Sequence, residues 1–526
     1  MKKLVSAAVI AALVAGTASA EVKTKINANG HYGTNLWKGI AAEEASSTED
    51  DSYWYDGAKD SWTDDVTLQI TSDNAGVKIV ESIGSGSVAM NNYDVWVKYG
   101  DLRLDFGKIV NRAGIIGDSN GNWITTGTIL NKPGINNGVI TAYKNRGYLI
   151  GSDLECDVTD EAVEAAKRNA AKTAYDKVIA KYTAVKVGKK DGSGTDTLYY
   201  DENGYDVTDA AKKAAKAAAE EAYAKEPDLS ISWDSDSSLA KFGADSTSYS
   251  ADYTGTKQNA LWLTYGLGDL TLRGTMFTNK SKTFTDFNLQ AEYKKDALDA
   301  SLTMKFTDTL SGRDSEKDRY ALGTDFLTAL AVKYDINDEL SVFGAYTLGL
   351  PYMGREFSAS YSYTDDGGSN ITESESYSAM TMIHAVDLRA QYKSGAIMAL
   401  GAVNFTMINP SKYTKEIFKA AYDTDAETVM GIDVGAQFQY TLSDMVLIDF
   451  QTRYDCYDLM KKNDTEGLNS LIVRPGVVLA AEKNCTLTTG VEVTLDNMFT
   501  SEKDENSDKG MLVITTAIPL VFRVKL

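Results

Sequence analysis

The sequence predicts an all-β chain: a transmembrane antiparallel up-and-down β-barrel of about 16–20 strands with an inserted α-helical hairpin. Three observations predict this class. Apolar and polar residues alternate along segments of about ten residues, the length that a tilted strand needs to cross a bilayer. Short turns join these segments on one side and long polar connections join them on the other. After residue 20 no apolar run, including residues 396–403, approaches the ~18–20 residues that a spanning helix needs.

The first twenty residues have the composition of a secretory signal peptide. Met1 is followed by Lys2 and Lys3, then by an apolar run, and residues 17–20 read Thr-Ala-Ser-Ala. A basic start, a short apolar stretch and an A-x-A site are the three parts of such a signal. We therefore expect export, with a mature chain that begins at Glu21.

Composition excludes several classes of function. The net charge of −21 would repel nucleic acid, so no nucleic-acid partner is expected. The three cysteines, Cys156, Cys456 and Cys485, lie far apart and give no disulfide framework or zinc site. Only His31 and His384 could supply an imidazole, and no Ser/His/Asp set or carboxylate dyad can be placed. We expect no enzyme activity, no cofactor and no metal site.

Both ends of the mature chain alternate with a period of two. From Val22 to Tyr32 the even positions form one face and the polar odd positions, such as Lys23 and Lys25, form the other. At the C-terminus, the even positions from Leu512 to Leu526 carry apolar residues and Thr516. Four of these form the candidate assembly signal: Leu520, Phe522, Val524 and Leu526.

A repeated hairpin joins many of the central segments. Each copy is an alternating segment that ends in a tyrosine, followed by a short polar turn and a second alternating segment. Tyrosines at the same place in six hairpins would form one ring around a closed sheet, as an aromatic girdle at the lipid–water interface does. The alternative is a simple preference of strands for tyrosine before a turn. The six residues are Tyr99, Tyr265, Tyr293, Tyr334, Tyr392 and Tyr440.

The connections on the other side are long, polar and rich in Asp and Glu, and we interpret the acidic runs as solvated surface. The expected long connections are residues 38–64, 111–136, 235–256, 307–325, 349–383, 406–429, 455–469 and 496–510. Counting strands between them gives about 20, and an even number leaves both termini on the periplasmic side. The pair at residues 138–150 and 228–234 is the least regular, which sets the lower limit of about 16.

Residues 157–227 do not alternate and predict a helical insert. They are rich in Ala, Lys and Glu, and Asp-Val-Thr-Asp opens a helical pattern at Asp157 and again at Asp206. The glycine-containing runs between the helices lack EF-hand spacing and are interpreted as turns. The expected division is a signal peptide (1–20), a barrel part (21–156), the insert (157–227) and a second barrel part (228–526). If residues 138–150 form one complete strand, the insert leaves from the periplasmic rim, which we expect. A tight turn at residues 144–147 would place it outside the cell.

Residues 93–114, reading YDVWVKYGDLRLDFGKIVNRAG, resemble the early hairpin of general bacterial porins. The closing segment also resembles the porin C-terminal assembly signal, except that Leu526 replaces the usual aromatic residue. The resemblance implies a bacterial outer-membrane location, and insertion by the barrel-assembly machinery. No constriction-loop motif can be assigned.

Half of the twelve arginines fall on the polar face of expected strands. On a lipid-facing side each would cost ~2–4 kcal/mol near mid-membrane, so we expect them to line the pore. The resemblance implies a basic wall that faces acidic loops. The alternative is structural pairing with Asp105, Asp299, Asp433, Asp449 and Glu492. The six candidates are Arg103, Arg273, Arg389, Arg453, Arg474 and Arg523.

Two hypotheses of function remain. The first is a porin that lets small hydrophilic solutes or ions diffuse passively, with outer-membrane lipid around it and a homo-oligomer left open. The second is a surface adhesin or structural barrel that binds partners through its long acidic loops. A TonB-type receptor is disfavoured because no plug precedes the first expected strand.

Overall fold

The computed structural model describes residues 22–41, 62–84, 87–109, 129–131, 133–146, 148, 160–189, 193–225, 229–233, 258–278, 284–307, 325–354, 356–364, 370–422, 424–460, 469–482, 484–497 and 512–525. The predicted signal peptide (residues 1–20), Cys156 and Leu526 lie outside the described residues, as does most of the predicted acidic loop sequence.

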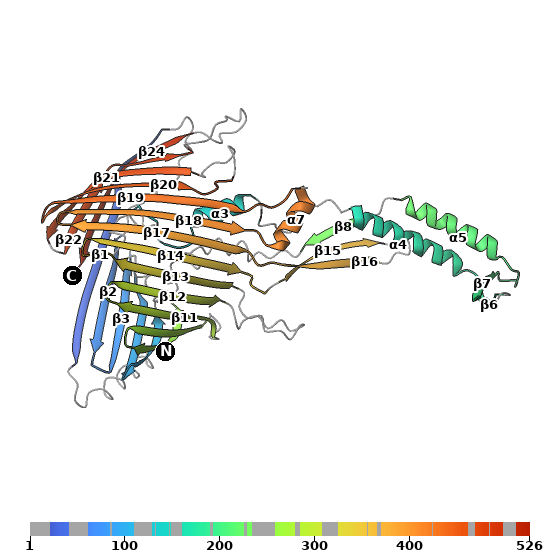
Figure 1. Ribbon diagram of the computed structural model, residues 1–526, viewed down its shortest axis with the longest axis horizontal. Coiled ribbons are helices and arrows are strands. Elements are labelled where there is room, and N and C mark those ends of the chain that lie inside the picture. The colour runs from blue at the N-terminus through green and yellow to red at the C-terminus, as the bar shows by residue number, and fades with distance from the viewer. Residues whose placement is uncertain are drawn as a thin grey trace.

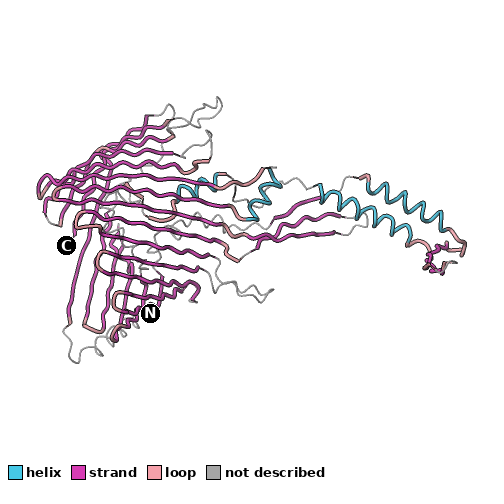
Figure 2. The backbone as a smooth tube through the Cα atoms, viewed as in Figure 1, coloured by secondary structure: helices cyan, strands magenta, loops and turns pink. Residues whose placement is uncertain are grey.

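One large antiparallel sheet makes up most of the described chain (Figures 1 and 2). Its strands are β1 (Lys23–Ala41), β2 (Trp62–Thr71), β3 (Ala75–Gly84), β4 (Ser87–Tyr99), β5 (Leu102–Ile109), β9 (Gln258–Leu267), β10 (Leu270–Thr278), β11 (Phe284–Lys295), β12 (Leu298–Thr307), β13 (Asp325–Asp335), β14 (Leu340–Pro351), β17 (Met382–Ser394), β18 (Ile397–Asn409), β19 (Val429–Ser443), β20 (Val446–Cys456), β21 (Asn469–Glu482), β22 (Cys485–Gly490), β23 (Glu492–Asp496) and β24 (Val513–Lys525).

The sheet closes on itself, because β1 pairs with β2 on one edge and with β24 on the other. Strands β22 and β23 are two halves of one crossing, since each pairs with both β21 and β24. The break between them faces Pro475, which has no N–H to donate to the ladder. The nineteen described strands of this sheet therefore make eighteen crossings. This confirms the predicted barrel and falls within the predicted strand range.

The turns at one end of the barrel, which we call the turn rim, are short. Gly100, Gly268 and Gly395 begin two-residue turns with φ of 58°, 63° and 55°. Asp296 has a φ of 50° at the equivalent place. Two-residue hairpins need this left-handed backbone, which glycine adopts without strain and Asp tolerates. The opposite end, which we call the loop rim, carries the long connections.

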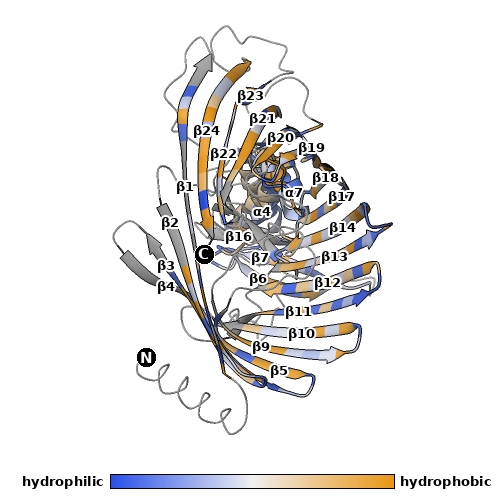
Figure 3. Cartoon of the chain, turned by 90° about the vertical axis from the view of Figure 1, so that its left-hand side faces the viewer, coloured by the Kyte–Doolittle hydropathy of each residue, from blue (hydrophilic) through white to orange (hydrophobic). Residues whose placement is uncertain are grey.

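Hydrophobic and hydrophilic residues alternate along many strands of the barrel (Figure 3), and the two faces of the wall differ in polarity. One face carries large apolar side chains that are about half exposed, and the other carries buried polar side chains. This is the reverse of a water-soluble protein and is typical of a barrel surrounded by lipid. Exposed examples are Leu263, Leu289, Leu330, Leu388 and Phe450, and buried polar examples are Thr275, Asn288, Thr303, Asp387 and Gln451.

A projection extends beyond the loop rim (Figure 1). Its base is a three-stranded sheet in which β15 (Glu356–Thr364) pairs with both β16 (Asn370–Ser378) and β8 (Leu229–Trp233). The helix α7 (Lys412–Tyr422) packs beside this base, where Tyr413 and Ile417 are buried with Tyr352 and Ala379. The connection between β14 and β17 thus anchors the projection to the barrel.

The outer part of the projection is the helical hairpin. Helix α4 (Asp160–Ile179) and helix α5 (Thr208–Tyr223) are joined by a two-stranded ribbon of β6 (Thr183–Gly188) and β7 (Thr195–Tyr200). Ala166, Ala211 and Ala215 are at most 1% exposed, so the two helices pack through small side chains. The structure therefore confirms the inserted helical hairpin, while the division into domains stays a prediction.

Three sequence expectations about the flanks of the hairpin are wrong. Residues 138–150 were expected to form a barrel strand, but α3 (Asn137–Asn145) is a helix. Residues 228–234 were expected to form a second barrel strand, but β8 belongs to the projection. The insert was expected at the periplasmic rim. It lies at the loop rim, because the connection between β5 and β9 contains it and starts there.

Candidate functional site: the lumen and the segment inside it

Strand β17 shows how the wall separates its two faces. Leu388 is 59% exposed, whereas its neighbours Asp387 and Arg389 are 0% and 5% exposed. Because side chains alternate along a strand, Asp387 and Arg389 share the inward face. Residues that pair across neighbouring strands lie on the same face of a sheet, so the pairing register identifies the inward residues of the other barrel strands.

By this register the six candidate arginines all lie on the inward face, and most contact a carboxylate. Arg103 contacts Asp105 and is 3.4 Å from Asp94, while Arg273 is 2.6 Å from Glu292. The remaining pairs are Arg453–Asp455 at 2.8 Å and Arg474–Glu492 at 3.7 Å, and Arg523 shares a face with buried Val521 and Ala517.

The acids proposed as structural partners divide into two groups. Asp105 and Glu492 contact arginines, as that alternative supposed. Asp299 instead lies 3.6 Å from Lys294, Asp433 accepts from Asn131, and Asp449 accepts from Gln437 at 2.8 Å. The arginines and these acids thus belong to a wider polar network.

Part of that network holds a segment of chain inside the barrel. We call residues 129–148 the lumen segment; it follows β5 in the chain and contains α3. Arg389 donates to the carbonyl of Asn131 at 2.6 Å, and the Gly134 N–H donates to Asp387 at 2.7 Å. Arg453 donates to the carbonyl of Ile129 and, at 3.1 Å, to the side chain of Asn131. Two candidate pore arginines therefore fix the lumen segment.

Apolar packing holds α3 against the same wall. Val139, Ile140 and Tyr143 are at most 4% exposed and join a cluster that includes Ile383, Ile408 and Val429 from β17, β18 and β19. Burial raises the pKa of the Tyr143 hydroxyl to about 12, so this side chain stays neutral. The cluster therefore lies against the inward face of these strands.

Glycines on the inner wall make room for the lumen segment. A Cβ on Gly431 would lie 2.3 Å from Val139, and a Cβ on Gly435 would lie 2.2 Å from Leu130. Both distances are far below van der Waals contact, so a larger residue at either place would displace the segment. The lack of a side chain at Gly431 and Gly435 of β19 thus allows the lumen segment to pack against the wall.

A polar clamp ends the lumen segment at the loop rim. Arg146 donates to both carboxylate oxygens of Asp458, at 2.6 and 2.8 Å, and lies 3.2 Å from Glu427. The Tyr148 hydroxyl accepts from the Glu427 N–H at 2.8 Å. A bidentate arginine–carboxylate pair of low exposure is among the stronger polar contacts in proteins.

Sequence reasoning missed the lumen segment, although a signal was present. The Asn136 side chain accepts from the Gly138 N–H at 2.8 Å, which is the geometry of a helix N-cap. Val139, Ile140 and Tyr143 then follow at helical spacing. The period-two alternation of the surrounding strands led to residues 138–150 being interpreted as a strand.

The six tyrosines lie on the outward face beside the turn rim. Their exposed fractions range from 37% for Tyr293 to 89% for Tyr99. Four of them pair with the first residue of the neighbouring strand: Tyr293 with Leu270, Tyr334 with Leu298, Tyr392 with Leu340 and Tyr440 with Ile397. Leu102 similarly opens β5 and pairs with both Tyr99 and Tyr265.

An outward polar pair marks the other limit of the apolar surface. The Tyr346 hydroxyl and His384 Nδ1 are 2.8 Å apart, near the loop rim. Along β17, Tyr392 follows His384 by eight residues, or ~26 Å along the strand at ~3.3 Å per residue. With a strand tilt of ~35–45°, this length covers about 20 Å along the barrel axis, somewhat less than the ~25 Å apolar band of membrane barrels.

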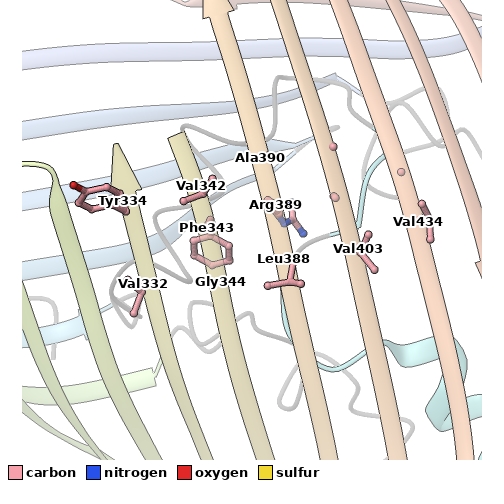
Figure 4. A pocket seen from close by; sticks show the side chains of 13 residues that line it. Val332, Tyr334, Val342, Phe343, Gly344, Leu388, Arg389, Ala390, Val403 and Val434 are labelled. Carbon is pink, nitrogen blue, oxygen red and sulfur yellow. The ribbon is translucent and has the colours of Figure 1, made fainter. Parts of the chain in front are cut away.

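The remaining candidates lie on β24 and on the outer wall. Leu520, Phe522 and Val524 share the outward face of β24, whereas Leu526 lies outside the described residues. An apolar depression of about 610 Å³ crosses β13, β14 and β17 to β19 (Figure 4). It lies where Gly344, Ala390 and Gly401 replace the larger residues found elsewhere on this face.

The described ranges contain neither a candidate metal site nor a candidate membrane-spanning helix. Among these residues, no group of three or more His, Cys, Asp or Glu side chains could hold a metal ion. Within the same part of the chain, no helix has the length and apolar character needed to span a membrane.

Comparisons with known proteins identify no family. No family model matches the sequence, and no curated protein matches it. Similar solved structures include Pseudomonas aeruginosa OpdQ (10% identity, TM-score 0.40, 96% of this chain and 98% of that chain) and OpdL of the same organism (8%, 0.39, 96% and 99%). An anion-selective porin from Comamonas acidovorans is also similar (8%, 0.37, 96% and 100%). Because these TM-scores are at most 0.40, no property of this chain is concluded from the similarity. The barrel fold is established by the chain's own strand pairing.

Proposed function

We propose that this protein is a channel of the bacterial outer membrane through which small hydrophilic solutes or ions diffuse passively. The observation that carries the proposal is a closed barrel with an apolar outer face and a polar inner face. A protein of this kind needs export and insertion, which agrees with the signal peptide and the assembly signal of the sequence. The turn rim then faces the periplasm and the loop rim faces outside.

The test is conductance of the purified, refolded full chain in a planar bilayer. We expect discrete single-channel steps and a reversal potential that depends on the salt gradient. Loss of heat-modifiability on a gel would mean that the barrel had not formed, so that control accompanies each measurement. A folded, heat-modifiable barrel that gives no current would contradict the channel function.

The lumen segment narrows the proposed pore. Its described residues contact the side of the lumen formed by β13, β14 and β17 to β20. We propose that solutes pass along the side formed by the other strands. Arg103 and Arg273 belong to that other side, and Arg389 and Arg453 hold the segment. We propose that Arg103 and Arg273 line the path of the solute. Arg389 and Arg453 set the width of that path by holding the lumen segment.

The projection favours a second candidate function, binding of a partner outside the cell. The sheet of β8, β15 and β16 and the hairpin of α4 and α5 extend well beyond the loop rim (Figure 1). We propose that residues 157–227 form a unit separable from the two barrel parts, 21–156 and 228–526. Cells that carry the protein without residues 160–225 should keep the channel activity. If the second candidate is correct, these cells lose adhesion to matrix that cells with the full chain retain.

A further inference from the structure

The inward face of the solute-path side carries exposed lysines near the turn rim. Lys25 pairs with Gln69, and Gln69 pairs with Lys78, so the two lysines flank Gln69 in one row across β1, β2 and β3 (Figure 1). Lys23 is the next inward residue of β1 toward the turn rim, where it pairs with Thr71. We give the name lysine patch to four residues, all of them exposed: Lys23, Lys25, Lys78 and Lys98.

The pairing register places the lysine patch on the inward face. Lys98 pairs with Arg103, which is one of the inward arginines. Lys78 pairs with Asp94, and Asp94 precedes Lys98 by four residues on β4 and therefore shares its face. The row through β2 extends this face to the two lysines of β1. The four lysines therefore face the proposed solute path.

The lysine patch lacks carboxylate partners. Among the described residues, none of its four members forms an ion pair. The inward acids of β4 and β5, Asp94 and Asp105, both contact Arg103. Lys98 lies opposite Arg103, and like charges opposite one another across a strand pair destabilise a sheet. An anion among the lysines would reduce this repulsion.

Other inward acids of the lumen are already paired. Glu292 lies 2.6 Å from Arg273, and Asp299 lies 3.6 Å from Lys294. On the opposite side, Asp387 is fully buried and accepts from a backbone N–H of the lumen segment, which also donates to acids of β19 and β20. Beside the patch, the solute path therefore presents unpaired positive charge. A path lined by one sign of charge concentrates ions of the opposite sign.

We propose that the lysine patch binds phosphate-bearing anions on their way through the channel. The inference rests on the proposed channel function and names its solute class. The site consists of ammonium groups on the inward faces of β1, β3 and β4, near the end of the path at the turn rim. None of the six candidate pore arginines belongs to it.

The spacing and chemistry of the lysines favour a compact anion with more than one charge. Neighbouring strands lie ~4.8 Å apart, so the Cα atoms of Lys25 and Lys78 are about 10 Å apart, and Lys23 is ~6.6 Å along β1 from Lys25. Their long, flexible side chains can therefore reach one group together. Each ammonium is a point charge with three donors, which suits the several oxygens of a phosphate, whereas a planar guanidinium fork suits a carboxylate.

The test measures block of single-channel current by glucose 6-phosphate added to the full chain in a planar bilayer. In about 0.1 M potassium chloride we expect concentration-dependent block, and in about 1 M salt weaker block, because the screening length falls from ~10 to ~3 Å. Lys25→Gln with Lys78→Gln keeps two polar side chains but removes two charges. This double variant should raise the concentration for half-maximal block about tenfold, which corresponds to ~1.4 kcal/mol.

Lys294→Gln is the matched control. Lys294 is an exposed inward lysine near the same rim, but it lies 3.6 Å from Asp299. Because its charge is already paired, this variant should leave the concentration for half-maximal block nearly unchanged. A rise equal to that of the double variant would mean that any inward lysine has the same effect, and it would overturn the assignment to the lysine patch.

The remaining results separate the two proposals. Ion current without block by glucose 6-phosphate, or equal block of the wild type and the double variant, would overturn the phosphate site and leave the channel function intact. Block by glucose at the same concentration would overturn the argument from charge. Block by succinate, which is also a dianion, at lower concentration would overturn the choice of phosphate. Absence of ion current from the folded, heat-modifiable wild type would overturn the channel function itself.

Discussion

The connection between β5 and β9 carries two helical regions with opposite surroundings. The lumen segment lies inside the barrel, whereas the α4–α5 hairpin lies beyond the loop rim. Val139, Ile140 and Tyr143 give α3 a large apolar face, and the hairpin buries mainly alanines. Larger apolar side chains gain more free energy on burial, at about 25 cal/mol per Å². The difference in side-chain size therefore agrees with the difference in location.

The two regions also differ in what holds them. The lumen segment depends on groups of the wall, including Arg389, Arg453 and Asp387. The hairpin depends on its own contacts, such as the exposed i,i+4 pair Lys216–Glu220 at 3.8 Å, and such pairs contribute only ~0.3–0.5 kcal/mol. Changes to the wall should therefore move the lumen segment and leave the hairpin in place.

The largest expected effect comes from a charge placed beneath α3. Val139 is fully buried, and burying an unpaired carboxylate costs several kcal/mol, so Val139→Asp should release the lumen segment. We expect this variant to show the greatest rise in single-channel conductance. Thr141→Asp is the control, because Thr141 is on the exposed side of α3. Similar conductance for Val139→Asp and the wild type would show that the segment does not limit the pore.

Two double variants separate width from charge. Arg389→Ser with Arg453→Ser removes two inward charges that hold the lumen segment, so both conductance and cation preference should rise. Arg103→Ser with Arg273→Ser removes two inward charges that do not contact the segment, so cation preference alone should rise. Reversal potentials in a salt gradient measure the preference. An unchanged reversal potential in both would mean that the arginines act only as structural partners.

A smaller effect is expected from Gly431→Ala. The new methyl group would meet Val139 and the carbonyl of Cys456, and overpacking of this kind costs ~1–3 kcal/mol. We expect a moderate rise in conductance and a lower temperature of heat modification. Gly401→Ala serves as the control, since a Cβ there has nothing within 4 Å. The interpretation fails if both variants shift by the same amount.

The smallest effect on conductance is expected from the hairpin. Ala215 is fully buried between α4 and α5, so Ala215→Glu should open the hairpin and expose it to protease on intact cells. Conductance should not change, because the hairpin lies outside the lumen. Ala214→Glu, on the exposed face, should alter neither property. Protection of the hairpin on intact cells, with cleavage only after lysis, would contradict its place outside the cell.

The barrel was predictable from sequence because its rules are local. Alternation along β17 or β24 identifies the two faces, and the tyrosines before the turns identify one rim. The inward position of Arg103 or Arg474 follows from the same alternation. What each arginine contacts does not, because Arg389 and Arg453 meet a segment more than 240 residues away in the chain.

The place of residues 129–148 was not predictable by the same route. The short apolar run of α3 is compatible with a helix or with a strand. The helix is favoured by contacts with distant residues, namely the glycines of β19 and the cluster around Ile383. The rim expected for the hairpin depended on whether residues 138–150 were assigned as a strand or as a helix. One wrong assignment of nine helical residues therefore reversed the expected side of the insert.

The antiparallel pairing of β8 with β15 has a mechanical consequence. Five residue pairs join them, from Trp233 with Ala359 to Leu229 with Tyr363. A tension applied to the end of the hairpin pulls β8 along its own axis, while β15 is rooted in the barrel through β14. The hydrogen bonds between them are then loaded together in shear and do not open one after another as in a zipper. A cell held by this projection would transmit part of the force to its barrel through those five pairs, beside the covalent connections that run from α3 to α4 and from β8 to β9.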